Sequence, residues 1–355
     1  MRSIRLGHAD PRKRGHAHGE AFRDEIRDLA GIRFELLERR SPIKGRERLL
    51  ELAAAHLPVL NREAPELGLE LEGIAEGSGV SAPELVVLNH YTDIRDVRTP
   101  IQGEEGGCSI VYGVSSEGPT LGQTWDMHGT AEPFVAVLEV EVPGGIPTLV
   151  FTVMGCLGMM GLNAEGVAVC INNLTPTDGR VGLLWPALVR QLLGYGTALE
   201  AHDHLMRAQL GSGHNYFIAD EQHAWNVETT GLKKVVTAHN PAASYWHTNH
   251  YLEPELKDLE APLYPTSTTL ERYDRLCQVM EGDQDWTVPA IKEILGSHDG
   301  YPRSICSHLK GDGDPSASKT CGAVVCDLQR RQLHAAPGCV HEAEYKVFSF
   351  ERGEG

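Results

Sequence analysis

The chain changes its pattern of apolar residues near residue 105, and this change limits the folds that it can adopt. Before that point, apolar side chains recur at helical spacing. The predicted helices are Glu20–Arg39, Arg46–Leu60, Ala64–Gly77 and Ala82–Tyr91. After it, short apolar runs between Gly and Pro residues predict strands. Groups of strands interleaved with groups of helices favour a layered α+β protein.

Helices separate the predicted strands into three groups. The strands are Cys108–Val114, Thr120–Trp125, Phe134–Val142, Thr148–Val153, Val167–Asn172, Tyr216–Ala219, His223–Glu228, Val235–Thr237, Ala323–Asp327, Gln332–Ala335 and Tyr345–Ser349. A helical block over Leu183–Leu210 follows the first group, and helices over Thr266–Met280 and Val288–Leu295 precede the last. Glycines and adjacent carboxylates in 102–107 predict an exposed, flexible connector before the first strand.

Charge and cysteine usage exclude several classes of protein. The 355-residue chain has a formal net charge of −17, which argues against binding to a nucleic-acid backbone. It has no run of about 18 apolar residues, so no membrane helix is expected. The first 30 residues lack the apolar stretch of a secretory signal, and we expect a cytoplasmic protein. The eight cysteines are scattered and form no C-x-x-C pair, which favours neither a disulfide framework nor a structural zinc site.

Gly107 and Cys108 stand between the connector and the first strand, where a specific reaction is available. Gly107 tolerates unusual backbone angles. The thiol of Cys108 could attack the carbonyl of Gly107, and water would hydrolyse the resulting thioester. Cys108 would then begin a new chain, and its α-amino group, whose pKa is about 7.7–8.0 in peptides, would be the base for its own thiol. A buried strand cysteine after a loop is the alternative.

Four further positions bring polar groups near this cysteine. A hairpin around Ser115–Pro119 would bring Asp126 to the cysteine end of the strand pair, where a carboxylate could hold an N-terminal ammonium. Asn172 and Asn173 end a strand, and Asn249 lies in a predicted loop. Side-chain amides donate hydrogen bonds to an oxyanion without changing charge, as acyl transfer requires. An ordinary turn or loop position is the alternative for each asparagine.

Five motifs in one order carry a resemblance to a known family. They are Gly107-Cys108-Ser109, Gln123-Thr124-Trp125-Asp126, the run Gly161–Val167, the run His247–Tyr251 and the run Tyr301–Cys306. Gly15-x-x-His18-Gly19 precedes them. With these motifs the chain resembles the acyl-coenzyme A:6-aminopenicillanic acid acyltransferase family, a group of autoproteolytic N-terminal-nucleophile enzymes. The resemblance covers nearly the whole chain.

The resemblance implies a fold and a processing step. The fold would be a four-layer αββα sandwich, and the precursor would cut itself between Gly107 and Cys108. Residues 1–107 would form a small helical subunit, and residues 108–355 would form the catalytic subunit. The two would make one compact body, because neither half would bury its apolar face alone.

The resemblance also implies roles for the site residues. Cys108 would be the nucleophile in self-cleavage and in turnover. Asp126 would be the active-site aspartate, and Asn249 would be the oxyanion-hole asparagine. The pair Asn172 and Asn173 would lie at the second amide contact, with either residue in that place.

Two positions depart from related sequences. Related bile-salt hydrolases and ceramidases have arginine three positions before the aspartate, where this chain has the neutral Gln123, in agreement with the penicillin branch. Family members often carry arginine directly after Ser-Ile-Cys, where this chain has Ser307. Arg303, four positions earlier, is the candidate for a cationic contact to the substrate or to the cleavage site.

Two other classes of function compete with this interpretation. His16 and His18 are a candidate ligand pair for a metal-dependent hydrolase, although their place before a helix favours an exposed cap. His202 and His204 lie in a predicted helix, where residues two apart point to different faces. The second rival is an inactive family member that keeps the fold and acts as a binding protein.

The resemblance implies amide-bond chemistry on small N-acylated compounds, by hydrolysis or acyl transfer through a thioester acyl-enzyme. We therefore expect a linear-amide C–N hydrolase or acyltransferase that is made as a zymogen, processes itself and needs no cofactor. Acyl-coenzyme A is a candidate acyl donor, but its phosphates need cations and the acidic chain shows no obvious basic cluster. A homo-oligomer is compatible with the sequence. The acceptor does not follow from the fold.

Overall fold

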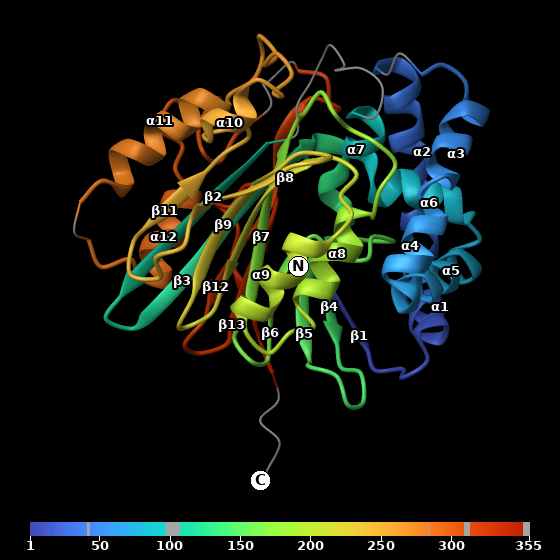
Figure 1. Ribbon diagram of the computed structural model, residues 1–355, viewed down its shortest axis with the longest axis horizontal. Helices are drawn as coiled ribbons and strands as arrows, with labels where there is room; N and C mark the ends of the chain where they lie inside the picture. The colour runs from blue at the N-terminus through green and yellow to red at the C-terminus, as the bar shows by residue number, and fades with distance from the viewer. Residues whose placement is uncertain (41–42, 97–106, 283, 309–312, 351–355) are drawn as a thin grey trace.

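Two β-sheets lie face to face and carry helices on both outer surfaces (Figure 1). The computed structural model describes residues 1–40, 43–96, 107–282, 284–308 and 313–350. The order helix, sheet, sheet, helix confirms the predicted four-layer αββα fold. The connector predicted at 102–107 lies outside the described residues, except for Gly107.

The larger sheet includes a strand from the start of the chain. Its order in the described residues is β1 (Arg2–Leu6), β4 (Val135–Val140), β5 (Thr148–Val153), β6 (Met160–Asn163), β7 (Ala168–Leu174), β8 (Gly213–Ala219), β9 (Ala224–Thr229) and β10 (Lys234–Ala238). β1 pairs with β4 in parallel, and the other neighbouring pairs are antiparallel. The prediction that the N-terminal part is purely helical is therefore wrong, because β1 forms only by pairing with a distant strand.

The smaller sheet holds Cys108. Its order in the described residues is β11 (Tyr245–His247), β2 (Gly107–Ser115), β3 (Gly118–His128), β12 (Ser318–Asp327), β13 (Gln332–Pro337) and β14 (Lys346–Ser349). β2 and β3 form the predicted hairpin, in which Gly107 pairs with Asp126 and Cys108 pairs with Trp125. The short connection at 116–117 sets this register.

Helices cover the outer face of each sheet (Figure 1). On the side of the larger sheet lie α1 (Pro11–Ala21), α2 (Arg23–Arg40), α3 (Arg46–Ala54), α4 (Leu57–Glu63), α5 (Pro65–Ser78), α6 (Ala82–Asn89), α7 (Tyr91–Asp96), α8 (Trp185–Leu192) and α9 (Ala198–Arg207). Outside the smaller sheet lie α11 (Thr269–Met280) and α12 (Val288–Leu295), while α10 (Pro254–Lys257) and the 3-10 helix η1 (Gly129–Phe134) are short connections. Within the described ranges, no helix combines the length and apolar character needed to cross a membrane.

Residues before and after the predicted cleavage site share one core. Besides the β1–β4 pairing, Glu70 on α5 accepts hydrogen bonds from Arg14 (2.7 Å) and from Arg190 on α8 (3.0 Å). His18 Nε2 accepts the backbone N–H of Gly155 at 3.0 Å. These buried contacts join the N-terminal helices to the sandwich, so the two segments form one body in the intact chain.

Alternation along β2 directs Cys108 into the space between the sheets. Successive strand residues face opposite sides of a sheet. Cys108, Ile110 and Tyr112 belong to the main core between the sheets, whereas Val111 packs in a second core with α11 and α12. The same alternation turns Ser109 toward α11, which supplies a basic side chain to the site.

Candidate active site

Cys108 lies at the start of β2 and lines a small cavity between the sheets. Its side chain is buried, and the residue is 7% exposed. The free volume of the cavity is about 30 Å³, which holds roughly one water molecule. The cavity is lined by Thr92, Cys108, Gln123, Trp125, Asp126, Met127, Met159, Met160, Ile171, Asn173, Trp185 and His214.

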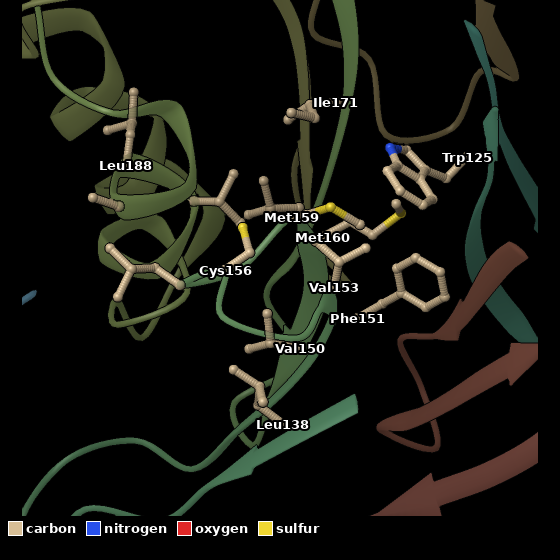
Figure 2. Close-up of a cluster of buried hydrophobic side chains, with 14 of the residues drawn as sticks. Trp125, Leu138, Val150, Phe151, Val153, Cys156, Met159, Met160, Ile171 and Leu188 are labelled. Carbon is tan, nitrogen blue, oxygen red and sulfur yellow. The ribbon is translucent and has the colours of Figure 1, made fainter. Parts of the chain in front are cut away.

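One wall of this cavity is apolar. Figure 2 shows Trp125, Met159 and Met160 in one cluster of buried side chains, with Ile171 close by. Methionine fills irregular space and adapts to different partners. The sequence patterns predict neither a strand nor a site at Met159 and Met160. These residues reach the cavity through the pairing of β5 with β6.

Side chains from distant segments hold the backbone of Cys108 on both sides. Its N–H donates to Asn249 Oδ1 at 2.8 Å. Its carbonyl oxygen accepts Asn172 Nδ2 at 3.0 Å and Arg272 Nη1 at 2.7 Å. The backbone N–H and the carbonyl of the predicted nucleophile, which belong to successive peptide groups, are therefore fixed by two side-chain amides and one guanidinium.

Arg272 is the site residue that sequence reasoning missed. It is 2% exposed and donates to Ser109 Oγ at 3.0 Å and to Asn249 Oδ1 at 2.8 Å, besides Cys108 O. A signal for it exists in the sequence, because Arg272 stands on the buried stripe of α11 together with Leu276 and Met280. An arginine within an apolar stripe needs a buried partner, and here that partner is the start of β2.

Asp126 lies opposite Gly107 in the hairpin and is 2% exposed. Its Oδ1 accepts the hydroxyl of Thr320 on β12 at 2.7 Å. Burial raises the pKa of Asp126, while Arg272 and Thr320 act in the opposite direction. A Cβ placed on Gly107 would lie 2.8 Å from Arg272 Nη2 and 3.0 Å from Asp126 Oδ2. Glycine thus lets the chain pass between the guanidinium and the carboxylate.

The thiol of Cys108 is protonated in the intact chain at neutral pH. Burial, and then the nearby charge of Asp126, raise its pKa to about 12, although Arg272 and hydrogen bonds from the Asp126 backbone and Gln123 act in the opposite direction. Because the thiolate is the nucleophilic form, attack by this sulfur requires a group that takes its proton.

The two adjacent asparagines on β7 have different surroundings. Asn172 is buried, and its Oδ1 lies 3.2 Å from His247 Nδ1. Glu228 in turn lies 2.9 Å from His247 Nε2, so a buried chain of three side chains orients the amide that holds Cys108 O. Asn173 lines the cavity, and its Oδ1 has no hydrogen-bond partner among the described residues.

Gln123 connects the two sheets beside Cys108. Its Nε2 donates to Ile171 O at 2.5 Å, and its Oε1 accepts Ile171 N–H at 2.8 Å. The amide therefore pairs with the edge of the β7 backbone in the way that a neighbouring strand would. A hydrogen bond from Gln123 also acts on the Cys108 thiol.

The structure does not bring Arg303 to the groups that hold Cys108. Its guanidinium is partly exposed and contacts Ser267 O at 2.8 Å and Glu271 at 2.8 Å. The cation beside Cys108 is Arg272 instead. Ser307, which stands where relatives often have arginine, donates its backbone N–H to Thr320 Oγ1 at 2.8 Å and so supports the hydroxyl that binds Asp126.

The histidine pairs weighed for a metal-dependent hydrolase do not converge. His18 is fully buried and accepts the Gly155 N–H, whereas the side chain of His16 is 47% exposed and lies near Glu20. The two therefore point to different sides of α1. The prediction of an exposed position holds for His16 and is wrong for His18.

These features together describe a site for acyl transfer: a buried thiol at the start of a strand, a carboxylate and an arginine on either side of the preceding glycine, and several oriented amides. Residues 114–336 match the sequence model of the family described as acyl-coenzyme A:6-aminopenicillanic acid acyl-transferase. The match spans more than half of the chain, and the chain belongs to this family. It covers Asp126, Asn249 and Arg272 and begins after Cys108.

The chain is similar to known proteins in sequence and, at lower identity, in structure. The acyl-coenzyme A:6-aminopenicillanic-acid-acyltransferase 40 kDa form of Emericella nidulans is 27% identical over 311 residues, which cover 84% of this chain and 83% of that protein. Penicillin V acylase from Agrobacterium tumefaciens matches with a TM-score of 0.37 and 13% identity, over 68% of this chain and 84% of its own. A mutant of the conjugated bile acid hydrolase from Clostridium perfringens matches with a TM-score of 0.36 and 10% identity, over 69% of this chain and 97% of its own.

Proposed function

We propose that this acyltransferase-family enzyme is a cysteine N-terminal-nucleophile amidase that activates itself by cleavage between Gly107 and Cys108. The observation that carries the proposal is the convergence of Asn249, Asn172 and Arg272 on the backbone of Cys108: Asn249 accepts its N–H, and Asn172 and Arg272 donate to its carbonyl. These contacts hold Cys108 on both sides, and the one to Asn249 involves the nitrogen of the peptide bond that would be cut. They suit a residue whose preceding peptide bond must change its chemistry in place.

In self-cleavage, Cys108 Sγ attacks the carbonyl carbon of Gly107, and the thiol proton passes to the departing nitrogen of Cys108. The C–N bond breaks and a thioester joins Gly107 to the sulfur. Water then hydrolyses the thioester, which leaves a carboxylate on Gly107 and a free α-amine on Cys108. Asp126, which faces Gly107 and has a raised pKa, is positioned to hold and return a proton during these steps.

In turnover, the new α-amine of Cys108 takes the proton from its own thiol, which attacks the substrate amide. Asn249 Oδ1 already faces this nitrogen and would accept from the amine as it accepts from the peptide N–H. Asn249 Nδ2 has two N–H groups, and the contact with Asn173 O uses one of them. The other is the proposed donor to the oxyanion, together with the side-chain amide of Asn173.

The cavity favours an apolar acyl group on the substrate. Trp125, Met159, Met160 and Trp185 are among the apolar side chains that line it. Among the described residues that line it, none is lysine or arginine, which offers no contact for the phosphates of coenzyme A. We therefore favour hydrolysis of small N-acyl compounds over transfer from acyl-coenzyme A, and we keep transfer to amines as a secondary activity.

N-terminal sequencing of the purified protein tests this proposal. We expect two fragments, with Cys-Ser-Ile-Val-Tyr at the start of the larger one, and a single uncut chain for Cys108→Ala. Cys277→Ala, which changes a half-buried cysteine in α11, is the matched control and should be cut like the wild type. An uncut wild type, or cleavage in Cys108→Ala, would contradict self-processing at this residue.

The two rival functions give other results in the same preparation. An inactive binding protein would keep one intact mass and hydrolyse no N-acyl substrate. A metal-dependent hydrolase would lose amidase activity in Cys108→Ala only in part, and all of it after the His16 and His18 side chains are removed. We expect His16→Ala to keep the amidase activity of the wild type. The His16 side chain is 47% exposed and holds none of the groups around Cys108.

A further inference from the structure

We propose a structural zinc site formed by His298, Cys306, His308 and Cys339, separate from the proposed catalytic centre. The four ligand atoms all lie within 4.8 Å of one another. The sequence offered no sign of it, because the ligands are spread over two loops without a C-x-x-C pair. His298, Cys306 and His308 lie between α12 and β12, and Cys339 follows β13.

Three of the distances between ligand atoms are close to those of a tetrahedral centre, and the distance between the two imidazole nitrogens is shorter. Zinc bonds of about 2.3 Å to sulfur and 2.0–2.1 Å to nitrogen place ligand atoms roughly 3.3–3.8 Å apart on the edges of a tetrahedron. The structure has Cys306 Sγ to Cys339 Sγ at 3.9 Å, Cys306 Sγ to His308 Nε2 at 3.7 Å and Cys339 Sγ to His298 Nε2 at 3.5 Å. The two Nε2 atoms, of His298 and His308, are 2.9 Å apart.

The chemistry of the donors selects the metal. Two thiolates and two imidazoles in a tetrahedral arrangement are a typical zinc set, and four protein ligands leave no open position for a catalytic water. The four cysteine and histidine side chains come together although nothing in the proposed acyl-transfer chemistry uses them. We therefore assign the site a structural role.

The surrounding backbone is built to hold these ligands. Cys306 N–H donates to Ser297 O at 3.1 Å, and His308 N–H donates to Pro302 O at 3.1 Å, so the loop folds back on itself and presents both side chains on one side. Backbone hydrogen bonds from Val340 and His341 reach the sulfur of Cys306. Such donors around a metal-bound thiolate orient it and reduce its charge.

The proposed zinc site lies beside residues that hold Asp126 through hydrogen bonds. The backbone of Ser307, next to the proposed ligand Cys306, makes two hydrogen bonds with Thr320. Its N–H donates to Thr320 Oγ1 (2.8 Å), and its carbonyl accepts the N–H of Thr320 (3.0 Å). The Thr320 hydroxyl donates to Asp126 (2.7 Å). A metal that ties this loop to Cys339 would therefore brace the strand that holds the carboxylate near Cys108.

Metal analysis of protein purified without a metal-affinity tag tests the proposal. With zinc in the growth medium, we expect about one zinc per chain by mass spectrometry of the elements, as a closed four-ligand site should retain. Cys339→Ser and Cys306→Ser should each lose at least about nine-tenths of it. Cys277→Ser is the matched control and should keep the full content, because its sulfur accepts from Trp246 Nε1 (3.3 Å) and does not belong to the cluster.

Two further measurements keep the test independent of folding and of catalysis. Cobalt added to metal-free protein should give the strong visible absorption of a tetrahedral centre with sulfur ligands, and zinc should abolish it; this signal should persist in Cys108→Ala. Zinc should raise the melting temperature of the wild type by at least about 5 °C and leave that of Cys339→Ser unchanged.

Several outcomes would overturn the proposal. They are a zinc content below about one tenth per chain, iron or copper in its place, zinc that stays in both cysteine variants, or a mass two hydrogens lower that shows a Cys306–Cys339 disulfide. None of these results would alter the expected self-cleavage at Cys108, so the two proposals fail separately.

Discussion

Cys108 and Cys306 are both buried cysteines whose pKa burial raises, but their neighbours differ in kind. Cys108 is surrounded by a carboxylate, a guanidinium and side-chain amides that hold its backbone and leave its sulfur facing a cavity. Cys306 has a second thiol and two imidazoles within contact distance of its sulfur or of one another. Burial and a raised pKa do not define a nucleophile; the atoms that surround the sulfur do.

The two environments also differ in how the chain builds them. The Cys108 site draws residues from β2, β3, β7 and α11 and from the loop after β11, so it depends on the pairing of strands and the packing of sheets. The Cys306 site draws all its ligands from loops. We expect changes in one site to leave the other measurable, and the following variants test that separation.

Replacing Arg272 should have the largest effect. Arg272→Leu removes the only described cation that contacts Cys108 O and leaves Asn249 and Asp126 without it. We expect self-cleavage to slow by about 10³-fold or more, the scale for losing buried charge stabilisation at a reacting centre. The measurement is the rate at which the two fragments appear after refolding.

Two companion variants interpret this result. Arg272→Lys keeps the charge but not the planar fork, so it should recover part of the rate. Arg303→Ala removes a partly exposed arginine and should be cut at the wild-type rate. Zinc content should be the same in all three. Fast cleavage in Arg272→Leu, or slow cleavage in Arg303→Ala, would reverse the assignment of the basic residue.

Replacing Asn249 should have the next largest effect. Asn249→Ala removes the acceptor of Cys108 N–H and the proposed oxyanion donor. We expect turnover to fall roughly 10²–10³-fold, the usual result for one oxyanion-hole donor. Rates should be divided by the fraction of chains that begin with Cys108, so that slower processing is not counted as slower catalysis.

Asn240→Ala is the control for this change. Asn240 lies in an exposed turn, where its Oδ1 accepts the N–H of Ala242. Its replacement should leave turnover within about twofold, as surface substitutions usually do. Turnover at the wild-type level in Asn249→Ala would remove this residue from the site.

The smallest effect concerns acid stability and belongs to neither cysteine site. Burial, partly offset by Glu70, lowers the pKa of His18 to about 4. Between pH 6.5 and about 4 the unfolded chain binds a proton at this histidine and the folded chain does not. The stability due to neutral His18 is therefore complete above pH 6.5 and is lost as the pH falls toward 4, by about 2–3 kcal/mol.

The variant His18→Gln isolates this contribution. The glutamine oxygen can still accept the Gly155 N–H but does not titrate in this range. Urea unfolding of the uncut Cys108→Ala chain, with and without the second change, should show a smaller loss of stability from pH 7 to pH 4.5 in the glutamine variant. Equal losses in both chains would mean that His18 is not the acid-sensitive group.

Local pattern was sufficient for the parts of the fold that close over short distances. The hairpin of β2 and β3 follows from two apolar runs and a short turn, and it correctly brings Asp126 opposite Gly107. β5 and α12 have the predicted bounds. The predicted helix Glu20–Arg39 is wrong at its start, because α1 begins at Pro11 and a break at Phe22 separates it from α2.

The spacing of residues in the sequence did not predict contacts between distant parts of the chain. Arg303 looked like the missing cation because it lies close to Ser307 in sequence, yet the guanidinium at Cys108 comes from α11. β1 has no alternation of its own and becomes a strand through β4. Spacing alone does not predict the cluster around Cys306, since its four side chains are neighbours only after β13 returns beside β12.

The sequence by itself determined most of the order of helices and strands, the family, and the glycine–cysteine pair at the start of β2. Those features depend on residues that are close together in the chain, where geometry follows from spacing. Tertiary structure alone decided which arginine faces Cys108, which asparagine holds it and which cysteines meet histidines. Those contacts depend on how two sheets stack, and the physical reason is that packing joins residues without regard to their distance along the chain.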